Sequence, residues 1–205
     1  FKKNKILSPK YFLINSVNFS PSLIERNIKK FKMVFPIIVK PSNEGSSIGV
    51  RICKNLKILK KTTKGLLKEY ESLIIEKFIG GQEIQVAVIN GKSLGAIELK
   101  PKRNFYDYKA KYSKKAKTKH IMPANLRRKK YIEVLNLAKK AHNALNCRGV
   151  TRSDFKFENN KFWILETNTQ PGMTDLSLVP EIAKDRGISF KKLVKSIILD
   201  AGINK

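Results

Sequence analysis

The stretch from residue 150 to residue 168 constrains the fold most, because its pattern predicts two strands with one charged and one apolar face. In its first half Arg152, Asp154 and Lys156 alternate with two phenylalanines. Successive side chains of a β-strand point to opposite faces of the sheet, so the charged and aromatic residues separate. We therefore expect a hairpin with one face on a core and the other available for chemistry.

The length of the hairpin turn decides which side chains meet across the two strands. With the three-residue turn 159–161, Asp154 lies opposite Glu166, and Arg152 lies opposite Asn168. A two-residue turn would divide the two carboxylates between the faces of the hairpin, because a one-residue slip reverses every side chain. The functional interpretation therefore predicts the three-residue turn.

Strict alternation in the returning strand places Ile164 on the face of Glu166 and Asn168, and places Trp163 and Leu165 on the reverse, against the two phenylalanines. Two carboxylates and an amide oxygen that converge form an oxygen-only site suited to Mg²⁺ bridged to nucleotide phosphates. The alternative is an exposed hairpin face with a salt bridge between the arginine and a carboxylate.

Two other segments have features of nucleotide binding. Lys40 closes the apolar strand 35–40 directly before the loop 44–49, whose backbone N–H groups and hydroxyls can wrap triphosphate oxygens. Residues 76–79 end another strand and can bind an adenine edge, while Glu83 can accept ribose hydroxyls. Each segment alone also fits a plain structural role, as a Gly/Ser loop or an edge strand.

The remaining pattern predicts an alternation of strands and helices. The expected strands besides the hairpin are residues 10–15, 35–40, 48–52, 72–79, 83–89 and 92–100. The expected helices are one capped near Ser20 and Ser22, one over 131–145, one beginning near Asp175 and one capped by Ser189. The strands between 72 and 100 indicate an antiparallel meander with a turn at Asn90-Gly91. Residues 101–125 indicate a long loop of the kind that forms lids.

The charge of the chain raises a second class of function. Its 43 Lys and Arg against 16 Asp and Glu give a net charge of +27, which favours contact with nucleic acids. Most of these residues are scattered lysines, without an aromatic stacking motif, so we expect a solvated basic surface and no nucleic-acid partner. A nucleic-acid-binding module would show steeply salt-dependent binding that is indifferent to Asp154→Ala.

Cysteine usage and hydropathy further narrow the class of protein that the chain can belong to. Cys53 and Cys147 form no CxxC pair and have no histidine cluster nearby, so neither a disulfide framework nor a zinc site is expected. No apolar run approaches the roughly 18 residues needed to span a bilayer, and we expect a soluble cytoplasmic protein without a membrane partner.

Several motifs together indicate a protein family. They are Val39–Pro41, Glu44–Gly49, Phe105–Tyr108 with Ala110–Tyr112, and Glu166–Thr174 followed by Ser177–Pro180. These motifs closely resemble the D-alanine–D-alanine ligases of the ATP-grasp fold, and the last one distinguishes them from other ATP-grasp enzymes. The resemblance extends from about Lys10 to the end of the chain.

The resemblance implies an α+β ATP-grasp fold, in which antiparallel sheets of two α+β subdomains grip ATP. Residues 1–75 would form the central subdomain with a connecting segment, and residues 76–205 the C-terminal catalytic subdomain, while the N-terminal substrate lobe of the family is absent. The implied activity is ATP-dependent joining of two D-alanines through an acyl phosphate, for peptidoglycan precursor synthesis. A truncated and inactive ATP-binding remnant is the alternative.

The resemblance also implies roles for individual residues. The implied catalytic residues are Arg152, Ser46, Tyr112 and Gly172. The implied ATP contacts are Lys40, Ser46, Ser47, Glu76, Lys77, Phe78, Ile79, Glu83 and Lys111. The implied D-alanine contacts are Tyr112, Arg152, Gly172, Ser177 and Leu178. Asp154, Glu166 and Asn168 would hold two Mg²⁺ or Mn²⁺ ions.

The chain departs from the family pattern at several points. Lys109 stands where the family commonly has glutamate, and the carboxylate hairpin is one residue shorter than usual.

The resemblance alone would imply two further partners, a second copy of the chain in a homodimer or an N-terminal lobe encoded separately. Tyr112 is similar to the dipeptide-forming members, which favours an amine as the nucleophile.

Overall fold

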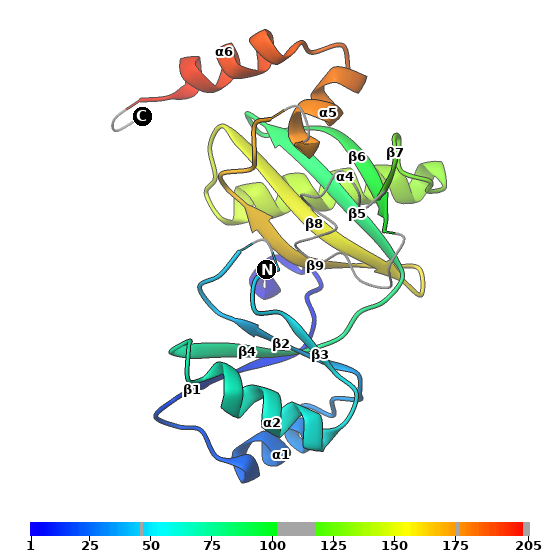
Figure 1. Ribbon diagram of the computed structural model, residues 1–205. Helices are drawn as coiled ribbons and strands as arrows, with labels where there is room; N and C mark the ends of the chain where they lie inside the picture. Colours follow the sequence, from blue (N-terminus) through cyan, green and yellow to red (C-terminus); the bar gives the residue numbers. More distant parts are fainter. Residues whose placement is uncertain (46, 102–117, 175–176, 203–205) are drawn as a thin grey trace. The chain divides into compact units, whose positions relative to one another are not determined.

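The computed structural model describes residues 1–45, 47–101, 118–174 and 177–202, and it divides into two compact units (Figure 1). The smaller unit contains Pro9–Ile79, and the larger unit contains Phe1–Ser8, Gly80–Lys100 and the described residues from Thr118 onward. Each unit combines an antiparallel sheet with helices, which confirms the predicted α+β class.

The smaller unit has a four-stranded antiparallel sheet in the order β1-β4-β2-β3. Its strands are β1 (Tyr11–Asn15), β2 (Ile37–Pro41), β3 (Arg51–Cys53) and β4 (Ser72–Lys77). Its helices α1 (Pro21–Lys30) and α2 (Leu56–Leu66) lie on one side of the sheet (Figure 1). Side chains of the sheet and of both helices, among them Ile14, Ile24, Leu59 and Ile75, are fully buried and form the core of this unit.

The helix starts in the smaller unit follow from side-chain caps. Ser20 caps α1 as predicted, because its Oγ accepts a hydrogen bond from the backbone N–H of Leu23 at 3.1 Å. Helix α2 was not predicted. Its signals are Asn55, whose Oδ1 accepts from the N–H of Ile58, and buried residues at helical spacing.

The larger unit has a five-stranded antiparallel sheet in the order β7-β6-β5-β8-β9. Its strands are β5 (Gln82–Ile89), β6 (Lys92–Lys100), β7 (Lys119–Ile121), β8 (Val150–Glu158) and β9 (Lys161–Asn168). Its helices are the 3₁₀ helix η1 (Lys2–Asn4), α4 (Arg128–Ala144), α5 (Leu178–Asp185) and α6 (Phe190–Asp200). Residues 1–8 belong to it because Ile6 enters its core and the N–H of Ile164 donates to the carbonyl of Leu7.

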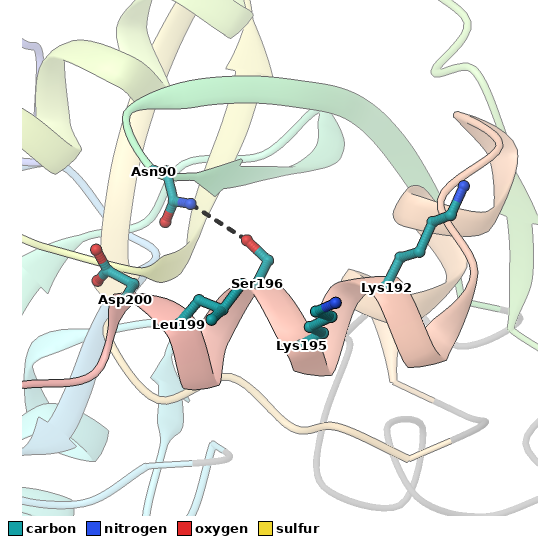
Figure 2. A pocket seen from close by; sticks show the side chains of 6 residues that line it. All are labelled: Asn90, Lys192, Lys195, Ser196, Leu199 and Asp200. Carbon is teal, nitrogen blue, oxygen red and sulfur yellow. Dashed lines mark hydrogen bonds between the residues drawn. The ribbon is translucent and has the colours of Figure 1, made fainter.

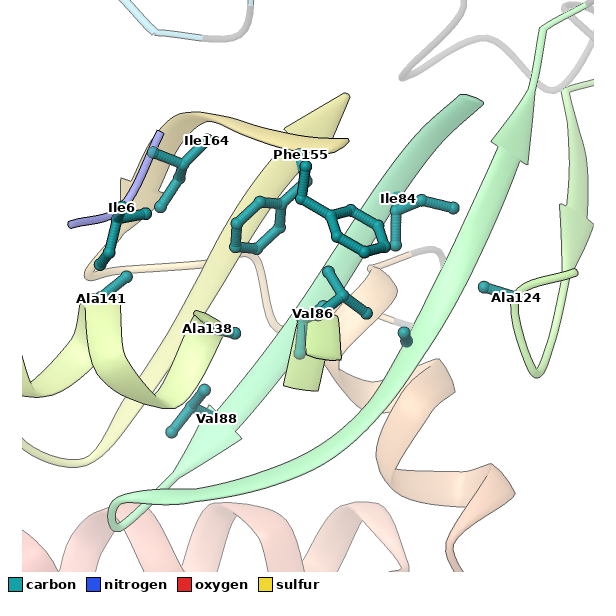
Figure 3. Packing of buried hydrophobic residues seen from close by; sticks show 12 residues of the cluster. Ile6, Ile84, Val86, Val88, Ala124, Ala138, Ala141, Phe155 and Ile164 are labelled. Carbon is teal, nitrogen blue, oxygen red and sulfur yellow. The ribbon is translucent and has the colours of Figure 1, made fainter. Parts of the chain in front are cut away.

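Helix α4 covers one face of the five-stranded sheet. Figure 3 shows the buried contact between them, where Ala138 and Ala141 of the helix pack against strand residues such as Val86 and Phe155. Helix α5 packs on the opposite face, since a Cβ on Gly95 would lie 3.3 Å from Ile182 of α5. The face with α5 also carries the charged residues of β8.

The predicted meander between residues 72 and 100 is wrong at its first connection. Strand β4 belongs to the four-stranded sheet, and β5 and β6 belong to the five-stranded one. Gly81, at φ +73°, lets the chain approach β8 so closely that a Cβ would lie 2.1 Å from the carbonyl oxygen of Phe157. The hairpin at Asn90-Gly91 is confirmed, with φ of 48° and 70° at the two turn residues.

Two other boundaries differ from the prediction. The short strand β7 lies inside the stretch predicted to be loop, where it extends the sheet by pairing with the end of β6. Helix α5 begins at Leu178, later than predicted, and Asp175 lies outside the described residues. The helices predicted over 131–145 and after Ser189 are confirmed.

Polar contacts link helix α6 to the rest of the larger unit. The amide of Asn90 donates to the hydroxyl of Ser196 at 3.2 Å, beside a shallow pocket of about 350 Å³ (Figure 2). Arg148 donates to the carbonyl of Asp200 at the end of the helix. Within the described part of the chain, no helix combines the length and apolar character that crossing a bilayer requires.

Candidate functional site

The turn of the β8–β9 hairpin is shorter than predicted. Glu158 pairs with Lys161, so the turn has the two residues Asn159 and Asn160, and the predicted three-residue turn is wrong. Both asparagines have left-handed backbone angles, with φ of 49° and 61°. Asparagine tolerates this conformation, and two such residues form the turn whose twist best matches the strands.

A β-bulge nevertheless produces the predicted pairing. The register shifts between Asp154 and Phe155, so that Phe155 lies opposite Ile164 while Asp154 lies opposite Glu166. Leu165 is the extra residue of the returning strand. One extra residue reverses the alternation beyond it, which brings the two carboxylates to one face despite the shorter turn.

The bulge also corrects the predicted faces of the returning strand. Ile164 does not share a face with Glu166, because it is fully buried in the core with Phe155. Trp163 lies opposite Lys156 and therefore belongs to the charged face. Phe157 meets Phe162, with ring centroids 4.4 Å apart, where Trp163 was expected.

The charged face is an ordered grid of side chains across β5, β8 and β9, because directly opposite residues of antiparallel strands point to the same side. We call it the carboxylate face. Its three rows are Glu83–Lys156–Trp163, Gln85–Asp154–Glu166 and Ala87–Arg152–Asn168. The grid places the predicted catalytic arginine and the three predicted metal ligands in two adjacent rows.

Arg152 and Asp154 form a bidentate ion pair on the carboxylate face. The Nε–Oδ1 and Nη2–Oδ2 distances are 2.8 and 3.1 Å. Glu166 is 3.8 Å from Arg152 Nη2, and its side chain is 51% exposed, whereas Asp154 is buried. The salt bridge expected for a purely structural hairpin is therefore present, and it occupies the same oxygens that a cation would use.

The donor set fits a hard divalent cation. Asp154, Glu166 and Asn168 offer only oxygen ligands, the kind that Mg²⁺ and Mn²⁺ prefer. Asn168 Oδ1 already accepts from the N–H of Gln170 at 2.9 Å, which fixes the orientation of its amide. Among the residues that the structure describes, no three His, Cys, Asp or Glu side chains form a cluster, so the predicted cation site would depend on the Asn168 amide as well as the two carboxylates.

Glu83, the predicted ribose contact, lies at the end of the carboxylate face. Its carboxylate is mostly buried and accepts from Lys156 Nζ, the residue opposite it, at 3.0 Å. The sequence indicated that Lys156 lies on the charged face but not that it pairs with Glu83. That pairing depends on the register of β5 against β8, which no local pattern reveals.

In the smaller unit, Lys40 and Glu76 are brought together. Lys40 Nζ lies 2.9 Å from Glu76 Oε1, because the two residues are diagonal neighbours on β2 and β4. The Glu76 side chain is 9% exposed and that of Lys40 is 23% exposed. Lys77 closes β4, and Ile79 beyond it is buried. One predicted phosphate contact, Lys40, and one predicted adenine contact, Glu76, are thus adjacent.

The loop after β9 is closed by Ser177. Its Oγ accepts from the N–H of Thr174 at 3.0 Å, and a Cβ on Gly172 would lie 2.8 Å from the same oxygen. Ser177 stands at the N-cap of α5 but makes no capping hydrogen bond with its side chain. Gly172, Ser177 and the first N–H groups of α5 are therefore close together.

Several predicted site residues remain untested by this geometry. Ser46, Lys111 and Tyr112 lie outside the described residues. Ser47 is described, with a left-handed φ of 63°, which suits a tight loop. Both histidines have structural partners: His120 pairs with Glu181 at 2.7 Å, and His142 hydrogen-bonds Thr151 in the core.

Comparisons with known proteins point to one family. A model of the family described as "D-ala D-ala ligase C-terminus" matches residues 2–199. A D-alanine–D-alanine ligase of Pelagibacter ubique (strain HTCC1062) is 55% identical over 208 residues, which cover 100% of this chain and 66% of that protein. The chain thus spans slightly less than two thirds of the length of this curated relative.

Solved structures show the same fold. The crystal structure of a D-alanine–D-alanine ligase from Bacillus anthracis has a TM-score of 0.82 at 29% identity, covering 97% of this chain and 63% of that one. A second crystal structure, of the Bacillus anthracis ligase complexed with ATP, has a TM-score of 0.79 at 24% identity. The match covers 97% of this chain and 62% of the Bacillus chain.

Proposed function

The chain belongs to the D-alanine–D-alanine ligase family, and from this premise we propose that it forms the ATP-binding and catalytic part of such a ligase. The observation that carries the proposal is the opposition of Asp154 and Glu166 beside Arg152 and Asn168. This geometry arises only because a bulge compensates for a short turn. A hairpin that served packing alone would not need the two carboxylates on one face.

The proposed cation site consists of Asp154, Glu166 and Asn168, which would hold two Mg²⁺ or Mn²⁺ ions. When bound, such ions neutralise phosphate oxygens and stabilise charge that develops on the transferred group. Arg152 would exchange its bidentate contact with Asp154 for the reacting carboxylate and phosphate oxygens. Guanidinium groups bind both kinds of oxygen bidentately, which suits this exchange.

The proposed D-alanine contacts are Arg152, Gly172, Ser177 and Leu178, with Tyr112 as a further contact. The N-terminus of α5 supports this assignment, because N–H groups at the start of a helix favour a carboxylate. The Ser177 hydroxyl is not used to cap the helix and faces the Gly172 backbone. Together they suit the carboxylate of the second D-alanine and a tetrahedral oxyanion.

The proposed nucleotide contacts are those that the family resemblance implies. Lys40, Ser46, Ser47 and Lys111 would contact phosphates, and Glu76–Ile79 with Glu83 would contact adenosine. ATP phosphates would compete with Glu76 for the Lys40 ammonium, and ribose hydroxyls would compete with Lys156 for Glu83. The existing ion pairs keep these side chains in place in the absence of nucleotide.

The activity proposed for the whole protein is the joining of two D-alanines with ATP through an acyl phosphate, for peptidoglycan synthesis in the cytoplasm. Dimer formation, or a separate N-terminal lobe, belongs to the same proposal. A second candidate is an inactive ATP-binding remnant of such a ligase, which would bind cation and nucleotide without joining D-alanines.

Cation binding tests the proposed site directly. Trp163 is the only tryptophan of the chain and lies on the carboxylate face, so paramagnetic Mn²⁺ held by Asp154 should quench its fluorescence. Asp154→Asn should weaken the Mn²⁺ affinity at least about tenfold. The matched control is Asp185→Asn, at the end of α5, where the carboxylate is more exposed than that of Asp154. This variant should leave the Mn²⁺ titration unchanged.

Turnover separates the two candidate functions. Phosphate release from ATP that depends on D-alanine, measured for this chain alone and with an added N-terminal lobe of a related ligase, should appear in at least one case. Mn²⁺ and ATP binding without any such release would instead favour the remnant. If Asp154→Asn quenches like the unchanged chain, the cation site itself is wrong.

A further inference from the structure

One polar side chain on the carboxylate face has a buried oxygen without a hydrogen-bond partner. Gln85 of β5 is 1% exposed, and its Oε1 is one of three such atoms in the described part of the chain. The other two are Thr63 Oγ1 in α2 and Glu98 Oε1, which lies opposite Ile84 on the α4 side of the sheet and has Lys100 Nζ at 3.5 Å. Only Gln85 belongs to the candidate site.

Gln85 lies in the middle row of the carboxylate face. It is directly opposite Asp154 of β8, which in turn is opposite Glu166 of β9. On its other side the neighbour is Ile97 of β6, an apolar residue. Neither a carboxylate nor an isoleucine side chain can donate a hydrogen bond to the amide oxygen. The diagonal neighbours on β8 are donors, but Arg152 contacts Asp154 and Lys156 contacts Glu83, and the Gln85 oxygen has no partner.

We expect a bound ligand to supply the missing hydrogen-bond donor to the Gln85 amide oxygen. Buried polar groups in folded proteins are almost always hydrogen-bonded, and leaving one unpaired lowers stability. A divalent cation supplies suitable donors, because Mg²⁺ keeps several of its water molecules when carboxylates bind it. Side chains that hydrogen-bond the ligands of a metal ion commonly raise the affinity of the site for that ion.

We propose that Gln85 is a positioning residue of the cation site: its amide oxygen accepts a hydrogen bond from a water molecule on the cation held by Asp154 and Glu166. The inference rests on the proposed function, since it requires a divalent cation at Asp154. It adds a third strand, β5, to a site otherwise built from β8 and β9. No bond is broken in this step, and no proton is transferred.

Two substitutions of Gln85 separate this role from a structural one. Gln85→Met keeps the length of the side chain and removes its acceptor, and Gln85→Glu keeps an acceptor. Mn²⁺ affinity would be measured in the 205-residue chain from the paramagnetic resonance signal of free Mn²⁺, with and without ADP. Thermal unfolding without cation would be measured in parallel.

We expect Gln85→Met to lower the Mn²⁺ affinity about tenfold. Its unfolding midpoint without cation should equal or exceed that of the unchanged chain, because an unpaired buried oxygen has been replaced by an apolar group. Gln85→Glu should bind Mn²⁺ at least as tightly as the unchanged chain. Thr63→Val removes another unpaired buried oxygen and should leave Mn²⁺ affinity unaltered.

The outcomes distinguish this inference from the proposed function. If Asp154→Asn weakens Mn²⁺ binding but Gln85→Met does not, only the role of Gln85 is overturned. If Asp154→Asn has no effect, the cation site is rejected, and the inference with it. A loss of both affinity and unfolding midpoint in Gln85→Met would show a structural role, and weaker binding by Gln85→Glu would contradict the acceptor role.

Discussion

Gly81 occupies a backbone conformation and a space that only glycine fits. Its φ is +73°, and a Cβ there would lie 2.1 Å from the Phe157 carbonyl oxygen. Gly91 has nearly the same angle, φ +70°, with no heavy atom within 4 Å of a Cβ. Comparing alanine substitutions at the two glycines therefore separates two losses of unfolding free energy, one from the left-handed backbone and one from steric overlap.

Substituting each glycine by alanine should give different losses of stability. Gly91→Ala should lower the free energy of unfolding by about 1–2 kcal/mol, the cost of the left-handed conformation. Gly81→Ala should lower it by about 2–5 kcal/mol, because overpacking against β8 is added. Denaturant unfolding of both variants measures the difference, and equal losses would show that β8 moves aside without cost.

His142 makes the stability of the larger unit depend on pH. The imidazole is buried beside Thr151, and burial lowers its pKa from the ordinary value of 6.5. The unfolded chain then takes up a proton at a higher pH than the folded chain does. Stability is therefore fully present above about pH 6.5 and declines as the pH falls from there toward the lower pKa of the folded state.

The variant His142→Gln isolates this contribution. We expect the unchanged chain to lose more unfolding free energy than His142→Gln between pH 7.5 and pH 5, because glutamine does not titrate. Urea unfolding at several pH values measures both curves. Parallel curves over this range would contradict the assigned pKa direction.

At the scale of elements, the β8–β9 hairpin shows which features local sequence predicts. The strands follow from alternation, and the opposition of Asp154 and Glu166 was predicted correctly. The turn was predicted wrongly, because two asparagines in succession can both adopt the left-handed conformation. The bulge at Leu165 has no sequence signal of its own, since it compensates for a register set by the turn and the core.

The turn can be improved without changing the site. Asn160 has φ 61°, and Asn-Gly is the preferred pair for this two-residue turn. Asn160→Gly should raise the free energy of unfolding by up to about 1 kcal/mol, because the left-handed angle costs glycine nothing. The hydrogen bond from Lys130 Nζ to the carbonyl of residue 160 is retained.

A matched variant shows that this gain belongs to the turn. Asn136→Gly, at an exposed position inside α4, should lower stability by roughly 0.3 kcal/mol, because glycine is only slightly less favourable than asparagine inside a helix. Thermal unfolding compares the two variants, and Mn²⁺ binding should be the same in both. A loss of stability in Asn160→Gly would contradict the cost assigned to the left-handed angle of Asn160.

Other helices and turns could be predicted where a short sequence motif marks them. Ser20 and Ser189 mark helix starts by their side chains, and Asn90-Gly91 marks a hairpin. The assignment of β4 and β5 to different sheets has no local signal, because both are apolar strands on either side of two glycines. The pairing of Gln85 with Asp154 likewise depends on long-range register.

At the scale of the whole molecule, charge is the dominant feature. Each unit has its own hydrophobic core, and the chain carries 43 basic against 16 acidic residues. Such an excess repels itself in the compact state more than in the unfolded chain. The ion pairs of the site, such as Arg152 with Asp154, neutralise only a small part of it.

Added salt should therefore stabilise this protein. The screening length is about 30 Å at 0.01 M and about 10 Å at 0.1 M ionic strength, so repulsion between surface lysines weakens across this range. We expect the thermal unfolding midpoint to rise between these NaCl concentrations. Lys195→Glu, which removes one positive and adds one negative charge on α6, should raise the midpoint at low salt and reduce its dependence on salt. A protein stabilised mainly by surface ion pairs would show the opposite slope, so a midpoint that falls with NaCl would exclude net repulsion as the governing effect.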